Sequence, residues 1–292
     1  DFKLYNLGPT TSTTYLSMNL NNRKNKDGKF YVNPVKQKWF QDINFRHAVD
    51  YAIDRKNMVF NIANGIAAPL FTPESLNSIY LNKNIKPYDK DLEKSKELLK
   101  KSGFYTKKGV LYDKDGNRVE FDLYTNAGNT EREAIGVMVK QDLEDLGMKV
   151  NFKPIEFNSL VNKLVSTFDW DMVIMGLTGS PLEPNGGKNV WLSDGRLHMF
   201  NMRTPQEGKI GILSWEKELD DCFTKGALAT KFEDRKKHYD RYQEIVNREK
   251  PFVYIYSPVV IVAIRDKFKN IYPSSLGGIT HNIEEIYVGR EK

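Results

Sequence analysis

The stretch DWDMVIMGLTGSPLEPNGGKNVWLSDGRLHMFN, residues 169–201, is the part of the sequence from which the rest is best interpreted. Residues 170–175 are a mostly apolar run of strand length, and such a run predicts a buried strand. Residues 176–187 contain four glycines and two prolines, so we expect the chain to leave the sheet there in a long loop. Trp191, Arg196, His198 and Asn201 follow in a segment that still lacks periodicity.

This loop is the candidate recognition surface of the sequence. In open α/β sheets, ligands bind in the crevice beyond the carboxyl ends of the strands. Free backbone amides together with an indole, a guanidinium and a carboxylate could recognise a small molecule there. The alternative is a long surface connection whose polar groups contact only water. Loops of this length are usually functional or disordered.

The totals indicate one large globular domain or two. The chain has 292 residues, 40% of them hydrophobic, which suffices for a packed core. Its longest apolar run, residues 259–264, is too short to cross a bilayer, and its start lacks a signal-peptide pattern, as expected of a mature chain or an excised fragment. The net charge of +6 comes from lysines interspersed with acids, so we expect no nucleic-acid partner. The lone Cys222 is expected in the core.

The order of periodic segments predicts parallel pairing in the middle of the chain. A strand at 119–123, a helix at 130–146, a strand at 148–152, a short helix at 158–165 and the strand at 170–175 follow one another. Strand–helix–strand units favour right-handed crossovers and parallel strands. Thr125, Asn126 and Thr178 should therefore leave the sheet on the same side, beside one cleft.

The flanking segments are expected to complete an α/β body. Residues 15–20 predict a strand, and residues 45–63 predict two helices, the second capped by Asp54. Residues 89–103 predict another helix, and residues 232–248 one more. Residues 252–256 and 259–264 predict two strands, because Ser257 and Pro258 separate them.

Motifs for catalysis, metals or cofactors are lacking in the sequence. None of the four histidines lies at ligand spacing on one helix, so neither a metal nor a cofactor is expected. No phosphate loop, nucleophile elbow or dinucleotide fingerprint is present. The enzymatic alternative is a hydrolase of peptides or glycosides that uses Asp169, Asp171 and His198. In a strand the two acids would point the same way.

Several ordered blocks resemble a known family. These blocks are FRHAVDYAIDR at 45–55, GIAAP at 65–69, the segment 94–104 with its terminal Ser-Gly-Phe, DLEDLGMKV at 142–150, and Arg235, Tyr239 and Gln243 before the strand at 251–256. Together they resemble the family 5 extracellular solute-binding proteins of bacterial ABC importers, the oligopeptide-, dipeptide- and nickel-binding group. The blocks span about 240 residues, which makes the resemblance far more specific than any single motif.

The resemblance implies a fold and a division of the chain. It implies an α/β, periplasmic-binding-protein-like type II lobe, with a mixed sheet flanked by helices and strands from the partner lobe. Residues 1–20 would cross to the first lobe, 21–250 would form the second, ligand-binding lobe, and 251–292 would return toward the first. Only the later part of such a protein is matched, so the chain is expected to be a fragment.

The resemblance also directs attention to six candidate residues of the cleft wall. Trp191 would offer an apolar platform, and Asn126 and Asn185 would hydrogen-bond ligand amides or hydroxyls. Glu183 is either a substitute for the family acid that pairs with a peptide's amino terminus or a solvated loop acid, since its register is shifted. The expected ligand-binding residues are Thr125, Asn126, Thr178, Glu183, Asn185 and Trp191.

The function implied is capture without catalysis. The chain would be part of the substrate-binding component of an ABC importer, with a peptide or other small solute as ligand and a membrane permease as partner. It would be a monomer at the periplasmic or extracellular face of the membrane, and a lipid anchor in the full-length protein is left open. Peptide, oligosaccharide and metal chelate remain alternatives for the ligand, and a protein-interaction module remains an alternative for the function.

Overall fold

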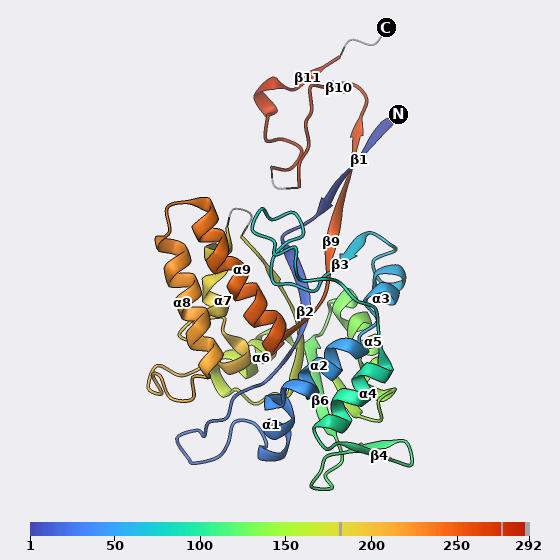
Figure 1. Cartoon of the computed structure of the whole chain (residues 1–292). Coiled ribbons are helices and arrows are strands. Elements are labelled where there is room, and N and C mark those ends of the chain that lie inside the picture. The colour runs from blue at the N-terminus through green and yellow to red at the C-terminus, as the bar shows by residue number, and fades with distance from the viewer. Residues whose placement is uncertain (181–182, 276, 290–292) are drawn as a thin grey trace.

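The computed structural model describes residues 1–180, 183–275 and 277–289, and a seven-stranded mixed sheet forms its centre (Figure 1). The strands hydrogen-bond in the order β1-β9-β2-β8-β6-β7, and β3 pairs with β9. The strands of this sheet are β1 (Phe2–Pro9), β2 (Ser12–Met18), β3 (Ala67–Pro69), β6 (Glu120–Asn126), β7 (Lys149–Ile155), β8 (Met172–Thr178) and β9 (Phe252–Arg265). Two small two-stranded sheets lie outside it, β4 (Tyr105–Lys107) with β5 (Val110–Tyr112), and β10 (Phe268–Lys269) with β11 (Tyr287–Val288).

The predicted parallel pairing is confirmed. β6 lies between β7 and β8 and runs parallel to both, whereas β2 pairs antiparallel with β8 and with β9. The predicted α/β fold with a mixed sheet flanked by helices is therefore confirmed. In Figure 1, helices α2 to α5 lie to the right of the sheet and α7 to α9 to its left.

Strand β8 starts and ends later than the sequence predicts. Trp170 precedes it, and Gly176 continues the strand where we expected the loop to begin. The reason is long-range pairing, because β2 runs alongside β8 as far as Ser12 opposite Thr178. Pro181 and Leu182 of the predicted loop lie outside the described residues.

The helices to the right of the sheet begin at side-chain caps. They are α1 (Pro34–Gln41), α2 (Ile43–Ala52), α3 (Arg55–Asn61), α4 (Leu92–Lys101) and α5 (Thr130–Glu144), with α1 at the lower end of the body in Figure 1. Asp54 caps α3 as predicted. Asp42 caps α2, and Asn129, one residue before Thr130, caps α5. Asp and Asn accept the free N–H groups of a first helical turn, which fixes these starting points.

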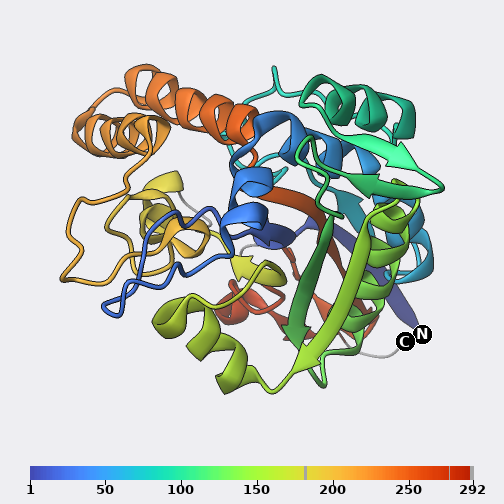
Figure 2. The same cartoon turned by 90° about the horizontal axis from the view of Figure 1, so that it is seen from below.

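The remaining helices and helical turns come after β7 in the chain. They are α6 (Phe157–Asn162), the π-helical turn η1 (Lys163–Thr167), the 3-10 turns η2 (Pro184–Gly187) and η3 (Met199–Asn201), α7 (Lys188–Trp191), α8 (Ser214–Leu228), α9 (Phe232–Glu249) and the short 3-10 turn η4 (Ile283–Glu285). Helices α8 and α9 pack side by side, as Figures 1 and 2 both show. Cys222 of α8 is buried, as expected. Within the described residues, no helix is both long and apolar enough to cross a membrane.

The last two predicted strands form one strand, β9, of 14 residues. Pro258 does not interrupt it. This residue stands where the neighbour of β9 changes from β2 to β1, and at that step the ladder requires no N–H group from position 258. Its carbonyl oxygen accepts the N–H of Thr10 at 2.8 Å. Beyond this step, β1 and residues 259–265 form a two-stranded arm that projects from the body (Figure 1).

Candidate functional site

The carboxyl ends of β6 and β8 lie at the same edge of the sheet, as predicted. Leu123 of β6 pairs with Met172 of β8, so the two parallel strands point the same way. β6 ends at Asn126, whereas β8 continues to Thr178. Beyond the end of β6, no strand of the described part of the chain therefore lies beside the last residues of β8 on that side.

This unpaired side of β8 exposes backbone groups that could bind a ligand. The antiparallel ladder with β2 extends to the amide of Gly179, which donates to the Thr11 carbonyl oxygen at 2.8 Å. Backbone groups alternate in direction along a strand, so those of Gly176 and Thr178 point away from β2. No strand pairs with them among the described residues. We call this segment, residues 176–178, the open edge of β8.

Arg132 lies beside the open edge. Its Nη1 donates to Asn126 Oδ1 at 2.8 Å and lies 4.0 Å from the Met175 sulfur. A Cβ on Gly176 would come within 2.8 Å of Arg132 Nη2, so glycine permits this approach. No carboxylate pairs with Arg132 among the described residues, which leaves a cation at the edge.

Sequence reasoning missed Arg132, although a signal was present. Arg132 stands in the first turn of α5, where acidic side chains are favoured by the helix dipole and a cation is not. An arginine there, directly after the carboxyl end of a strand, indicates a role outside the helix. Its neighbour Glu131 is engaged elsewhere, accepting the Tyr256 hydroxyl at 2.6 Å.

A small cavity of about 130 Å³ adjoins the open edge. Trp191 in its lining is buried and packs 5.4 Å, centroid to centroid, from Phe252. The hydroxyl of Tyr15, also in the lining, is buried and has no hydrogen-bond partner among the residues that the structure describes. Burial raises the pKa of Tyr15, and the charge of Arg132 offsets part of the rise. The described lining residues are Thr13, Tyr15, Pro73, Leu177, Thr178, Gly179, Gly186, Gly187, Asn189, Val190, Trp191, Leu197, Phe252 and Tyr254.

The structure brings three of the six expected residues to this place. Thr178 and Trp191 line the cavity, and Asn126 lies at the open edge through its bond to Arg132. The others are placed differently. Thr125 is buried within the sheet, where its hydroxyl donates to the Ile174 carbonyl oxygen at 3.1 Å.

Glu183 and Asn185 lie on the loop after β8, outside the cavity lining. Glu183 Oε2 accepts Arg235 Nη1 at 2.6 Å, and the other two guanidinium nitrogens of Arg235 donate to the Ala229 carbonyl oxygen. Burial lowers the pKa of Arg235, but the charges of Glu183 and Tyr80 and the hydrogen bonds to both together raise it above its ordinary value. Asn185 is half-buried within η2.

Comparison with known proteins gives the family. The model of the bacterial extracellular solute-binding proteins, family 5 Middle, matches residues 1–197. The chain belongs to this family.

Relatives of known sequence cover most of this chain. It is 29% identical over 254 residues to a "Probable ABC transporter-binding protein" of Deinococcus radiodurans, covering 81% of this chain and 41% of that protein. It is 27% identical over 231 residues to the oligopeptide-binding protein AppA of Bacillus subtilis, covering 76% and 40%. The chain thus spans about two fifths of the length of these relatives.

Solved structures share the fold. The oligopeptide-binding protein AppA of Bacillus subtilis, in complex with a nonapeptide, superposes with a TM-score of 0.71 at 21% identity, over 99% of this chain and 53% of that one. NikA of Brucella suis, in complex with Fe(III)-EDTA, superposes with a TM-score of 0.76 at 18% identity, over 98% and 53%. At these identities the likeness establishes the type II lobe architecture and no ligand.

In this family 5 member, the hydrolase residues are not assembled. Asp169 precedes β8 and pairs with Lys163 at 3.0 Å, so the two acids do not alternate along one strand as expected. Asp171 is held by Lys36 at 2.6 Å, at the end of β8 away from the cavity. Neither aspartate contacts His198 among the described residues.

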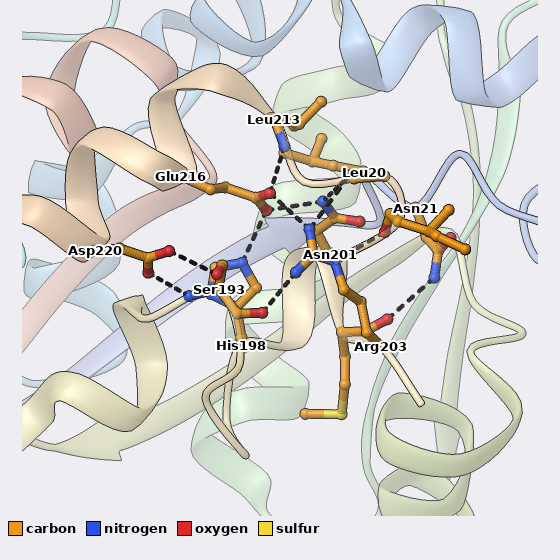
Figure 3. A network of polar contacts seen from close by, with 12 residues as sticks. Leu20, Asn21, Ser193, His198, Asn201, Arg203, Leu213, Glu216 and Asp220 are labelled. Atoms are coloured by element: carbon orange, nitrogen blue, oxygen red, sulfur yellow. Dashed lines mark hydrogen bonds and ion pairs between the residues drawn. The ribbon is translucent and has the colours of Figure 1, made fainter. Parts of the chain in front are cut away.

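His198 instead belongs to a buried network that holds the irregular segment before α8 (Figure 3). Its ring nitrogens contact the Val190 carbonyl oxygen at 3.0 Å and Glu216 Oε1 at 2.8 Å. Glu216 also accepts Asn201 Nδ2 at 2.8 Å and Arg203 Nη2 at 2.7 Å. Burial would raise the pKa of Glu216, but the hydrogen bond from His198 and the charges of His198 and Arg203 hold it below its ordinary value. Both ring nitrogens of His198 are engaged within this network.

Proposed function

We propose that this chain forms most of the ligand-binding second lobe of a substrate-binding component of an ABC importer. The proposed ligand is a peptide or another small solute, held without chemical change between this lobe and a partner lobe. The observation that carries the proposal is the open edge of β8 beside an aromatic cavity and an uncompensated arginine. Membership in a family of solute-binding proteins supports it.

The open edge suits an extended peptide better than a compact solute. Unpaired backbone groups on a sheet edge bind a peptide as an added strand, in which main-chain hydrogen bonds give affinity and pockets give side-chain selectivity. The groups of Gly176 and Thr178 point to the proposed ligand's backbone. The cavity at Trp191 would receive one apolar side chain, because it is small and aromatic.

The other expected residues receive roles consistent with their contacts. Asn126 positions Arg132, which would bind a carbonyl or carboxylate oxygen of the ligand. Glu183 holds the loop through Arg235, so in this proposal it does not receive a ligand ammonium group. Thr125 supports the edge from within the sheet, and Asn185 would hydrogen-bond the ligand from the rim.

The arm supports the proposed division of the chain. Phe2 and Leu4 of β1 are 60% and 70% exposed, and Ile261 of β9 is 45% exposed. Large apolar side chains exposed together on a projecting ribbon mark a surface that another element covers. We propose that the partner lobe covers it, with residues 1–20 and 251–292 crossing toward that lobe and residues 21–250 forming this one.

The remaining assignments follow from the importer role. The proposed partner of the complete protein is a membrane permease, and its proposed place is the periplasmic or extracellular face of the membrane. We propose a monomer without enzymatic activity, cofactor or nucleic-acid partner. Family 5 members are solute-binding proteins, which agrees with a binding role.

Removing one backbone donor from the open edge tests the proposal. Thr178→Pro deletes an N–H that points away from β2, a strand position where proline is tolerated. In the full-length protein, the proline variant should bind unmodified tripeptides to pentapeptides more weakly, by a factor of about ten at most, as measured by calorimetric titration. This is the value of one lost hydrogen bond of roughly 1 kcal/mol. Thr178→Val keeps the N–H and should bind like the parent.

Two outcomes would refute the proposal. Equal affinities for the proline and valine variants would mean that the edge does not contact the ligand. Absence of any heat with peptides, together with a non-peptide molecule found by mass spectrometry in the denatured full-length protein, would assign a different solute. Melting temperatures of both variants exclude misfolding as the cause of lost binding.

A further inference from the structure

Six exposed cations gather at the end of the molecule farthest from the arm. They come from the last turn of α4, the hairpin of β4 and β5, and the turn that follows it, at the bottom of Figure 1. Figure 2 views the molecule from this end. We call this group the basic end, and its members are Lys100, Lys101, Lys107, Lys108, Lys114 and Arg118.

Packing contacts make the basic end one surface. A Cβ on Gly103, just after α4, would lie 3.2 Å from the Lys114 Cβ, so the turn lies against the helix end. Tyr105 and Tyr112 stack across the hairpin with centroids 5.7 Å apart, and Tyr112 forms a bridge with Arg118. The end of α4, the hairpin and the following turn therefore form one continuous surface.

No ion pair neutralises the basic end within the described residues. Nearby cations of the same helix are paired, since Lys94 lies 3.2 Å from Glu97 and Lys96 lies 2.7 Å from Glu93. The two acids of the adjoining turn are engaged by other residues. Asp115 pairs with Lys38 at 3.2 Å, and Asp113 accepts Trp39 Nε1 at 2.8 Å.

The residues of the basic end suit a diffuse anionic surface better than a single bound anion. Five of the six cations are lysines, whose compact, hydrated charges lack the bidentate geometry with which arginine binds one carboxylate or phosphate. Tyr105, 47% exposed among them, has the apolar ring and polar tip suited to a membrane–water interface. Anionic lipid headgroups attract each nearby lysine or arginine additively.

We propose that the basic end docks on the phosphate headgroups of an anionic membrane surface. Docked this way, the molecule directs its arm and the open edge of β8 away from the lipid, so ligand capture is unobstructed. The attraction decays within a Debye length, and binding therefore weakens with salt. The proposal does not depend on the identity of the captured solute.

Vesicle co-sedimentation of the full-length protein without a lipid anchor tests this docking. Vesicles with about 30 mol% phosphatidylglycerol in phosphatidylcholine should bind the protein at about 0.05 M salt and release it at about 0.5 M. Pure phosphatidylcholine vesicles should not bind it. Neutralising four cations, by Lys107→Gln, Lys108→Gln, Lys114→Gln and Arg118→Gln, should lower the partition coefficient on the order of a hundredfold or more.

A matched control has the same loss of net charge elsewhere. Lys83→Gln, Lys209→Gln, Lys217→Gln and Lys231→Gln change exposed cations outside the basic end, and this variant should keep most of the vesicle binding. Equal loss in the two variants would overturn the proposal, because only net charge would then matter. Release by inorganic phosphate, but not by chloride of equal ionic strength, would also overturn it in favour of a discrete anion site.

Discussion

At the scale of single residues, the approach of Arg132 to Gly176 organises the open edge. A methyl group at position 176 would meet Arg132 Nη2 at 2.8 Å and the Thr13 carbonyl oxygen at 3.2 Å. The first atom ends a flexible side chain, whereas the second is backbone and cannot yield as easily. Gly176 therefore keeps both the arginine and the strand in place.

Gly176→Ala should displace Arg132 and weaken ligand binding by about tenfold, the value of one charge-assisted hydrogen bond. Calorimetry of the full-length protein measures this. In an Arg132→Ala background the glycine substitution should weaken binding less than it does alone, because only its contact with the Thr13 carbonyl oxygen then remains. Full additivity of the two losses would show that Gly176 matters for another reason.

Glu183 gives a second prediction at this scale. Because Arg235 already occupies its carboxylate, Glu183→Gln should leave affinity for peptides nearly unchanged, and amino-terminal acetylation of the peptide should matter equally little. Side by side titrations of free and acetylated peptides measure both effects. A variant that loses affinity only for peptides with a free amino group would show that Glu183 binds the ligand's ammonium group instead.

Residue identity alone predicted only part of the site. The positions of Thr178 and Trp191 beside one cavity could be predicted, because a strand end and a loop aromatic follow from local pattern, whereas their contact with a ligand stays a prediction. The environments of Glu183 and His198 were not, because their partners, Arg235 and Glu216, lie 52 and 18 residues away. A side chain's role as ligand group or as structural support depends on such distant partners.

At the scale of elements, Glu216 ties the irregular segment before α8 to that helix. It is fully buried, and it accepts four hydrogen bonds, from His198, Asn201, Arg203 and the backbone of Leu213. Removing the carboxylate leaves the Arg203 guanidinium buried without its counter-charge. Glu216→Gln should therefore lower the free energy of unfolding by about 3–5 kcal/mol in urea titrations.

The same carboxylate predicts a dependence on pH. Its folded-state pKa lies below the unfolded-state value, so between the two the unfolded chain binds more protons. The stabilisation is present above the ordinary glutamate pKa and is lost as the pH falls through the lowered value. Glu218→Gln, an exposed site on the same helix, should not change that acid slope. An identical slope in the Glu216 and Glu218 variants would contradict the assignment.

Element types were more predictable than element lengths. Periodicity and capping residues give α3 and α4 from local sequence. Strands β8 and β9 run longer than predicted, because pairing with β2 and β1 extends them through Gly176 and Pro258. Glycine and proline interrupt an isolated segment, but a neighbouring strand supplies the missing constraint.

At the scale of the whole molecule, the chain is half of the ligand-binding unit we propose. It covers 53% of the AppA structure, and its arm leaves apolar side chains exposed. A lobe without its partner offers a ligand only one wall of the cleft. Calorimetry should therefore give weaker binding for residues 1–292 alone than for the full-length protein, and comparable affinities would contradict closure of two lobes around the ligand.

The most direct test of the account is amide hydrogen exchange at the open edge. We predict that a saturating peptide ligand slows exchange of the Gly176 and Thr178 amides in the full-length protein, because an added strand accepts their N–H groups. The Gly179 amide, already bonded to Thr11, should change little. Unchanged exchange at Gly176 and Thr178 with the ligand bound would contradict the account.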